Sequence, residues 1–274
     1  MAALLAGALA LAGCGTLNTG SAEAENAPTA LASTNIASLS DVVQRNPNDA
    51  QAYNVRGTVL GQNGKPKEAL ADFDKAIGID PNFTQAYANR GLVHRQTGNA
   101  EAALADYSRA IALDPNYAVA YLGRGMTYRQ KGDALAALQD FNKAIAIRPN
   151  NAQAYYNRGL LYQGQKQYQY AIDDFTTAIG LVQREAEPLV ARGLTHLAMN
   201  DAKSAAADLD DAVQIEPENL QAWTSRGLAY ERLGNSERAV GSYAKALSIN
   251  QTFAPAKSGF ARLGGKYGQS YQAF

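Results

Sequence analysis

A fixed pattern of large and small positions recurs along most of the chain. The dipeptide Arg-Gly occurs six times at intervals of 34 residues, from Arg56-Gly57 to Arg226-Gly227. A bulky side chain stands three positions before each arginine, and another stands three positions after each glycine. Because offsets of three and four residues fall on one face of an α-helix, each unit is predicted to begin with an amphipathic helix.

The second part of each unit predicts another helix. An alanine is followed four residues later by a ring or a leucine, and three residues after that by a second alanine, as in Ala69, Phe73 and Ala76. In four units a proline follows, as at Pro81, and the residue before a proline disfavours the helical conformation. We expect the glycine of the first helix to pack against the first alanine of the second, since small residues allow helices to approach closely.

A 34-residue helix–turn–helix with this spacing resembles the tetratricopeptide repeat. The resemblance implies an all-α fold, a right-handed α-solenoid in which neighbouring repeats bury each other's faces. It covers six repeats, at residues 50–83, 84–117, 118–151, 152–185, 186–219 and 220–253.

The segments beside the repeats predict two capping helices. Residues 35–49 match a second helix without its first and are expected to cover the N-terminal end of the stack. Residues 254–265 begin with a proline at an early position and end at Gly264-Gly265, as expected for a helix that covers the C-terminal end. Residues 266–274 form a tail.

The start of the chain is expected to lie outside this fold. Residues 1–13 are an apolar stretch of signal-peptide length, although no basic residue precedes Arg45, so the start codon is left open. Their end, Leu11-Ala12-Gly13-Cys14, resembles the lipobox of bacterial lipoproteins, which implies that Cys14 is lipidated and anchors the chain in a bilayer. The alternative is a buried cysteine in an apolar helix. Residues 14–34 are then a flexible tether.

Each unit also carries charges at fixed places. The arginine before the glycine is present six times, and an aspartate precedes the ring of the second helix in five units, with Ser242 in the sixth. Since the aspartate is missing only where no further repeat follows, we expect pairing from one repeat to the next. The expected pairs are Asp72 with Arg90, Asp106 with Arg124, Asp140 with Arg158, Asp174 with Arg192 and Asp208 with Arg226. An anion-binding arginine row is the alternative.

The composition excludes several kinds of function. With 25 basic and 25 acidic residues the chain has no net charge, so no nucleic acid is expected as a partner. One cysteine excludes an internal disulfide framework. The two histidines, His94 and His196, stand where other units have tyrosine, and are interpreted as core substitutions. No nucleophile motif is present, and we expect no enzyme, no metal and no cofactor.

The resemblance implies that the first helices line a concave, partner-binding groove. The preferred contacts are Arg95, Arg129 and Tyr156, because Arg and Tyr contribute disproportionately to interfaces; ordinary solvated surface is the alternative. Further candidates beside the packing positions are Asn54, Asn89, Met126, Gln163, Thr224 and Glu231. The family's carboxylate clamp does not map, since Asn54, Thr58, Val119 and Gly123 stand at its positions.

Two functions are carried forward. The leading hypothesis is a lipid-anchored scaffold at the periplasmic face of the bacterial outer membrane that recruits cell-envelope enzymes. The outer membrane is favoured by Gly15, through the resemblance to enterobacterial sorting rules. The alternative is a pilotin-like assembly factor for a type IV pilus secretin. A homodimer is left open, as is the identity of the partner protein.

The fourth junction departs from the pattern. No proline follows Leu181, and the fifth unit has Leu189, His196, Asn200 and Leu209 at aromatic or glycine positions. We expect the loosest packing there, through neutral drift or as a hinge.

Overall fold

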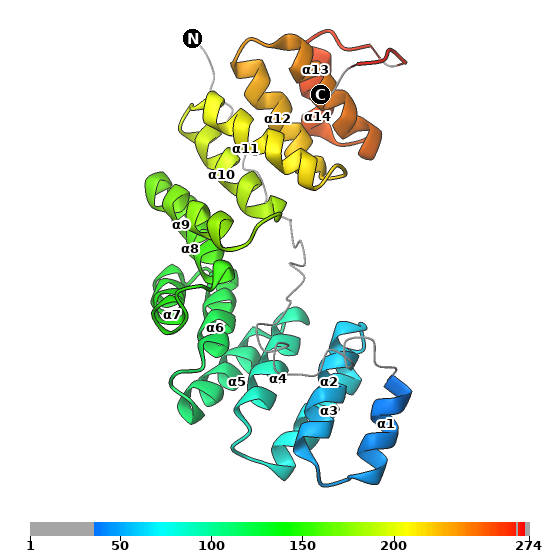
Figure 1. Cartoon of the computed structure of the whole chain (residues 1–274), viewed down its shortest axis with the longest axis vertical. Coiled ribbons are helices and arrows are strands. Elements are labelled where there is room, and N and C mark those ends of the chain that lie inside the picture. The colour runs from blue at the N-terminus through cyan, green and yellow to red at the C-terminus, as the bar shows by residue number, and fades with distance from the viewer. Residues whose placement is uncertain (1–35, 267, 272–274) are drawn as a thin grey trace.

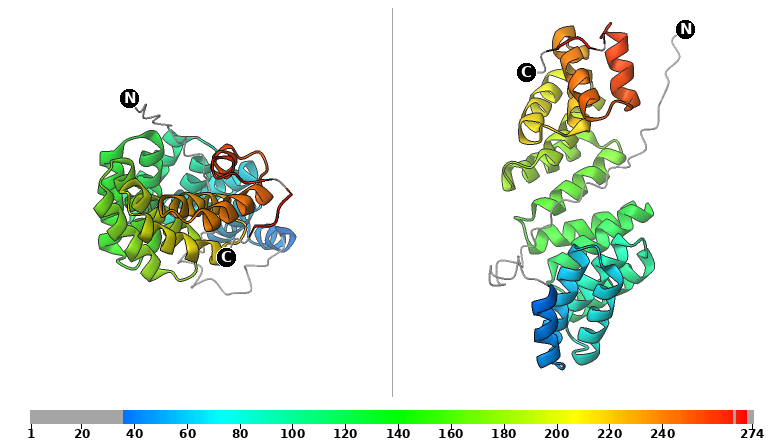
Figure 2. Two further views of the ribbon diagram at one scale, coloured as in Figure 1. Left: turned by 90° about the horizontal axis from the view of Figure 1, so that it is seen from above. Right: turned by 90° about the vertical axis from the view of Figure 1, so that its right-hand side faces the viewer.

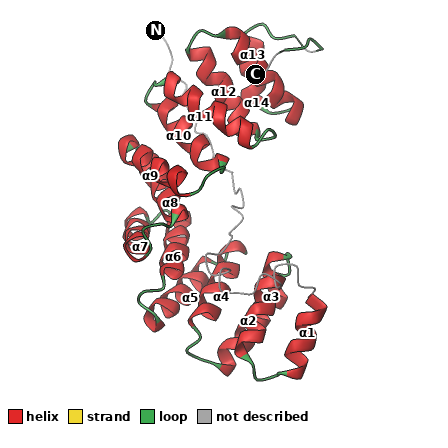
Figure 3. Cartoon of the chain, in the orientation of Figure 1, coloured by secondary structure: helices red, strands yellow, loops and turns green. Residues whose placement is uncertain are grey.

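The computed structural model describes residues 36–266 and 268–271. The expected signal peptide, the lipidation site Cys14 and the tether lie outside the described residues. In the described part of the chain the structure has fourteen α-helices and no strand, so the predicted all-α solenoid is confirmed (Figure 3). The helices are α1 (Ile36–Arg45), α2 (Ala50–Gln62), α3 (Pro66–Ile79), α4 (Thr84–Gln96), α5 (Ala100–Leu113), α6 (Ala118–Lys131), α7 (Ala134–Ile147), α8 (Ala152–Gly164), α9 (Tyr168–Leu181), α10 (Ala186–Ala198), α11 (Ala202–Ile215), α12 (Leu220–Arg232), α13 (Ser236–Ile249) and α14 (Ala254–Arg262).

Helices α2 to α13 form six pairs, one in each of the repeats between residues 50 and 253. The even-numbered helix is the first of each pair, and it packs along its odd-numbered partner and against the first helices of the neighbouring repeats. The pairs stack into a curved solenoid, with α1 at one end and α14 at the other (Figures 1 and 2). A row of first helices therefore runs along the stack.

Short turns join the two helices of each pair, and one residue of each turn is left-handed. Four of these positions are glycines, among them Gly132 with a φ of 81°. The fourth and fifth repeats instead have Lys166 and Asn200, with φ values of 60° and 62°. Glycine adopts this conformation without steric cost, whereas lysine does not, so Lys166 is a site of local strain.

The core shows what the Arg-Gly glycines do, and it corrects one expectation. A Cβ added at Gly57 would lie 2.9 Å from the ring of Phe73, on the second helix of the same repeat, with no alanine among its nearest atoms. The same holds at Gly159 beneath Phe175. The expected glycine–alanine contact is therefore wrong at this position: the glycine makes room for the large residue of the second helix.

Two repeats use a second glycine for the same purpose. Tyr107 lies against Gly123 of the next repeat, and Tyr243 lies against Gly259 of the capping helix α14, both 16 residues further along the chain. An added Cβ at Gly123 would lie 2.7 Å from the Tyr107 hydroxyl oxygen and closer still to the ring. The repeats with a phenylalanine or leucine in the second helix carry asparagine, alanine or serine at this place. The glycine on the following helix thus makes room for the larger tyrosine ring.

The fourth junction is irregular, as expected, but the fifth repeat that follows it is well packed. Its Leu189 and Leu209 are buried, in a continuous apolar cluster that runs from Ala186 to Phe260 and includes both the fifth and sixth repeats. At the junction itself, Arg184 has a φ of 71° and Leu189 borders a cleft of about 310 Å³. Leucine fills less of this space than the aromatic residue of the other repeats.

Candidate partner-binding surface

The arginine–aspartate pairs form within each repeat. Arg90 donates to both carboxylate oxygens of Asp106, from Nε at 2.9 Å and from Nη2 at 2.6 Å. Equivalent bidentate pairs join Arg56 to Asp72, Arg124 to Asp140, Arg158 to Asp174 and Arg192 to Asp208. The predicted inter-repeat pairs, Asp72 with Arg90, Asp106 with Arg124, Asp140 with Arg158, Asp174 with Arg192 and Asp208 with Arg226, are therefore wrong.

The same arginines do connect neighbouring repeats, but through a different residue. The remaining nitrogen, Nη1, of Arg90 donates to Asp74 in the preceding repeat at 2.6 Å. The equivalent donations run from Arg124 to Ser108, Arg158 to Asn142 and Arg192 to Thr176, and from Arg56 to Ser40 in α1. The partner lies 16 residues before the arginine, as the paired aspartate lies 16 after it. Each guanidinium thus bridges two repeats.

In the sixth repeat the arginine also bridges two repeats, although no aspartate precedes the ring of its second helix. Arg226 is buried, donates to Asp210 of the preceding repeat at 2.6 Å, and donates to Ser242 of its own repeat at 2.7 Å. In all repeats but the fifth, the arginine also lies over the aromatic ring three positions before it, 5.3 to 5.8 Å from the ring centre. These guanidinium groups are therefore engaged in packing and pairing, which makes the arginine row structural.

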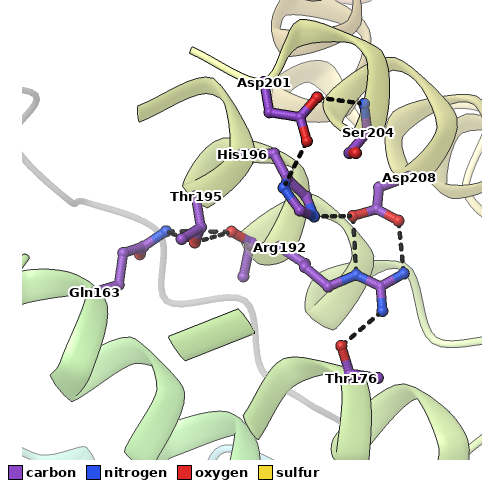
Figure 4. A network of polar contacts seen from close by, with 9 residues as sticks. Gln163, Thr176, Arg192, Thr195, His196, Asp201, Ser204 and Asp208 are labelled. Atoms are coloured by element: carbon purple, nitrogen blue, oxygen red, sulfur yellow. Dashed lines mark hydrogen bonds and ion pairs between the residues drawn. The ribbon is translucent and has the colours of Figure 1, made fainter. Parts of the chain in front are cut away.

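The two histidines lie beside the arginine–aspartate pairs, which together form a ladder along the stack. His196 Nε2 is 3.9 Å from Asp208, which pairs with Arg192, and His196 Nδ1 is 3.6 Å from Asp201, the N-cap of α11 (Figure 4). His94 has the same relation to Asp106 at 3.9 Å. Both side chains are half-buried in the helix packing, as expected for substitutions of the tyrosine, but each adds a contact to a ladder carboxylate.

Several of the predicted groove residues form hydrogen bonds within the protein. Asn89 donates its amide to Asn54 at 3.0 Å, and Asn54 is buried. Gln163 donates to Thr195 at 2.8 Å, across neighbouring first helices (Figure 4). Thr224 donates to a backbone carbonyl, and Glu231 accepts from Arg262 of the capping helix α14 and from Tyr243. These side chains therefore stabilise the row of first helices.

The preferred contacts lie in the middle of that row. Arg95 is on α4, and its side chain interacts with the hydroxyl of the buried Tyr107. Arg129, on α6, donates to Asn157 at 3.3 Å. Tyr156, on α8, packs its half-buried ring 5.9 Å from that of Phe175.

The surroundings of Tyr156 bring opposite charges together. Burial, and after it the negative charge of Glu187, raise the pKa of Tyr156 to about 12, while the positive charge of Arg129 opposes the increase. The tyrosine therefore lies between a cation on α6 and an anion at the start of α10. Glu187 was not among the residues predicted from sequence, although its place in the first turn of a first helix could have indicated it.

A row of aliphatic side chains completes the surface. In every repeat after the first, the residue that follows the Arg-Gly dipeptide is aliphatic and partly exposed; these residues are Leu92, Met126, Leu160, Leu194 and Leu228. Of these, only Met126 was predicted, and the others could have been found from the repeat period. We call this row, with Arg95, Arg129, Tyr156 and Glu187, the inner surface.

The fold and this surface define a class of protein: an interaction scaffold built from helix-pair repeats, which offers a row of side chains along its first helices. Sequence models for the tetratricopeptide repeat match residues 50–83, 152–182 and 190–255, and a model for the TPR repeat matches residues 91–132 and 125–166. The chain belongs to the tetratricopeptide-repeat family. A comparison with curated protein sequences finds no match.

Solved structures share the fold at low sequence identity. The APC/C hetero-tetramer Cut9–Hcn1 superposes with a TM-score of 0.72 at 21% identity, over 82% of this chain and 45% of that chain, so this chain spans less than half of its length. PilF of Pseudomonas aeruginosa gives 0.71 at 18% identity, over 78% and 97%. PilW, a widely conserved type IV pilus biogenesis factor, gives 0.70 at 14% identity, over 76% and 97%. These similarities show the fold.

Proposed function

We propose that the inner surface binds a segment of a partner protein. The observation that carries this proposal is the arrangement on successive first helices of Arg95, Arg129 and Tyr156 beside a continuous aliphatic row. Arginine and tyrosine contribute strongly to binding energy, and partly exposed aliphatic side chains supply area to bury. Family membership supports a role as a protein-interaction scaffold.

We further propose that the scaffold is a lipoprotein, anchored through Cys14 at the periplasmic face of the outer membrane, and that it recruits cell-envelope enzymes. The support is the lipobox-like sequence before Cys14. No helix in the described part of the chain is long and apolar enough to cross a membrane. Metabolic labelling with a fatty acid, followed by membrane fractionation, tests the anchor: label and membrane association should be lost with Cys14→Ala.

The partner-binding proposal is tested by cross-linking and co-purification. Arg95→Glu combined with Arg129→Glu should release proteins that the natural chain retains, because two cations on the inner surface become anions. Lys75→Glu combined with Lys143→Glu is the matched control, since both lysines are exposed on second helices. Equal recovery with all three forms would refute binding at the inner surface.

A second candidate is a pilotin-like assembly factor for a type IV pilus secretin. The fold similarity to PilF and to the pilus biogenesis factor PilW, over nearly the whole length of both, favours it. Deleting the gene should then deplete secretin multimers from the outer membrane. Normal multimers in the deletion strain would leave the recruitment of envelope enzymes as the better assignment.

A further inference from the structure

The first helices carry an uneven distribution of charge. Helices α2, α4, α6 and α8 contain no aspartate or glutamate at all. Acidic residues appear only in the later first helices, as Glu187 in α10 and Glu231 in α12. Glu231 is neutralised by two hydrogen bonds from Arg262, at 2.6 and 2.8 Å. The acidic part of the inner surface is therefore the start of α10.

The cations lie on the other side of Tyr156. Arg95 and Arg129 occupy equivalent positions on α4 and α6, two neighbouring first helices that contact each other. Arg95 interacts with the hydroxyl of the buried Tyr107, and Arg129 donates to the amide oxygen of Asn157 at 3.3 Å. An anion brought by a partner would meet two guanidinium groups at this place.

The acidic side consists of two glutamates. Glu187 lies in the first turn of α10, and Glu185 directly precedes that helix. The two carboxylates repel each other, and neither has a basic partner among the ion pairs of the described residues. The partly exposed side chains of Met126, Leu160 and Leu194 belong to α6, α8 and α10, the helices that carry Arg129, Tyr156 and Glu187.

We propose that the partner is a segment with separated charges, and this inference rests on the proposed function of the inner surface. Its acidic side chain binds at Arg95 and Arg129, and its aliphatic side chains lie on Met126 and Leu160. A lysine or arginine further along binds at Glu187. Charge complementarity of this kind sets the position of the segment, because a shift along the groove would place like charges together.

Selection from a library of random peptides tests this assignment. Peptides of about 15 residues, about 22 Å long as a helix, are displayed and selected on the full chain at low salt. The enriched peptides should carry acidic residues toward one end, basic residues toward the other and aliphatic residues between. With Glu187→Lys the basic preference should be lost and the acidic one kept, whereas Arg129→Glu should do the reverse.

A charge-reversal cycle makes the test specific. An enriched peptide should bind about tenfold more weakly to the Glu187→Lys variant, and replacing its basic residues with glutamate should recover most of that loss. Lys143→Glu and Glu237→Lys, both on exposed sites of second helices, are the matched controls and should leave binding unchanged. Circular dichroism of each variant checks that the helices persist.

The outcomes separate the two proposals. Enriched peptides without separated charges, or unchanged selection on the reversed variants, would overturn the charge assignment and leave the proposed function standing. No enrichment on any form would overturn the proposed function. Enriched peptides that match a stretch of this chain, together with self-association of the chain, would place a second copy in the groove and overturn the assignment to a partner.

Discussion

Replacing Gly123 with alanine should loosen the junction between the second and third repeats. The added Cβ would stand 2.7 Å from the Tyr107 hydroxyl oxygen, about 1 Å closer than a normal carbon contact. Overpacking of this kind costs about 1–3 kcal/mol, whereas alanine in place of glycine within a helix returns about 1 kcal/mol. We therefore expect a net loss of up to about 2 kcal/mol in the free energy of unfolding.

The same substitution should be harmless beside a smaller ring. The fourth and fifth repeats already combine Phe175 with Ala191 at the equivalent positions. Phe175 lies closer to the glycine of its own repeat than Tyr107 does, with nearest approaches to an added Cβ of 2.6 and 3.2 Å. In the Tyr107→Phe background the ring can move toward Gly91, so Gly123→Ala should there be neutral or stabilising.

Native-state hydrogen exchange measures this coupling. Because repeat arrays unfold in parts, protection of the α6 amides reports the junction better than a single melting temperature. The double-mutant cycle should give a coupling free energy of about 2 kcal/mol between positions 107 and 123. Equal destabilisation by Gly123→Ala in both backgrounds would show that the tyrosine is not the reason for this glycine.

Three further predictions concern the fourth and fifth repeats. Leu189→Tyr should fill the cleft and stack on Arg192, raising the thermal stability by about 1 kcal/mol, and an unchanged melting temperature would contradict the packing account. Lys166→Gly should stabilise by about 0.5–1 kcal/mol in urea unfolding, since it removes a left-handed lysine; a loss would show that the side chain contributes more than the strain costs. Burial, with the charges of Glu187 and Glu216, raises the pKa of Glu185 above 4.5, so its contribution to stability is fully present below the unfolded pKa and is lost as the pH rises through the folded one. Glu185→Gln should therefore raise the melting temperature more at pH 7 than at pH 4. The same increase at both pH values would exclude the carboxylate as its source.

Much of the fold was predictable because its determinants are local. Helix periodicity, the glycines of the turns and the prolines between repeats act within a few residues, and they identified the helix pairs, the repeat length and the family. The resemblance to the family also implied that the first helices line a groove, and from it Arg95, Arg129 and Tyr156 were predicted as contacts. The acidic residue Glu187 was missed because it stands at the start of its helix, away from the positions that the other contacts share.

The partners of the repeated side chains were decided only by the tertiary structure. Arg90 could pair with Asp72 of the preceding repeat or with Asp106 of its own repeat, which are at similar distances along the chain, so sequence separation could not tell which carboxylate it contacts. Asp106 takes the bidentate place because the two helices of one repeat pack more closely on each other than on the neighbouring repeat. The glycines followed the same logic: sequence required a small residue, and the packing decided that a ring or a leucine, and not alanine, lies above it.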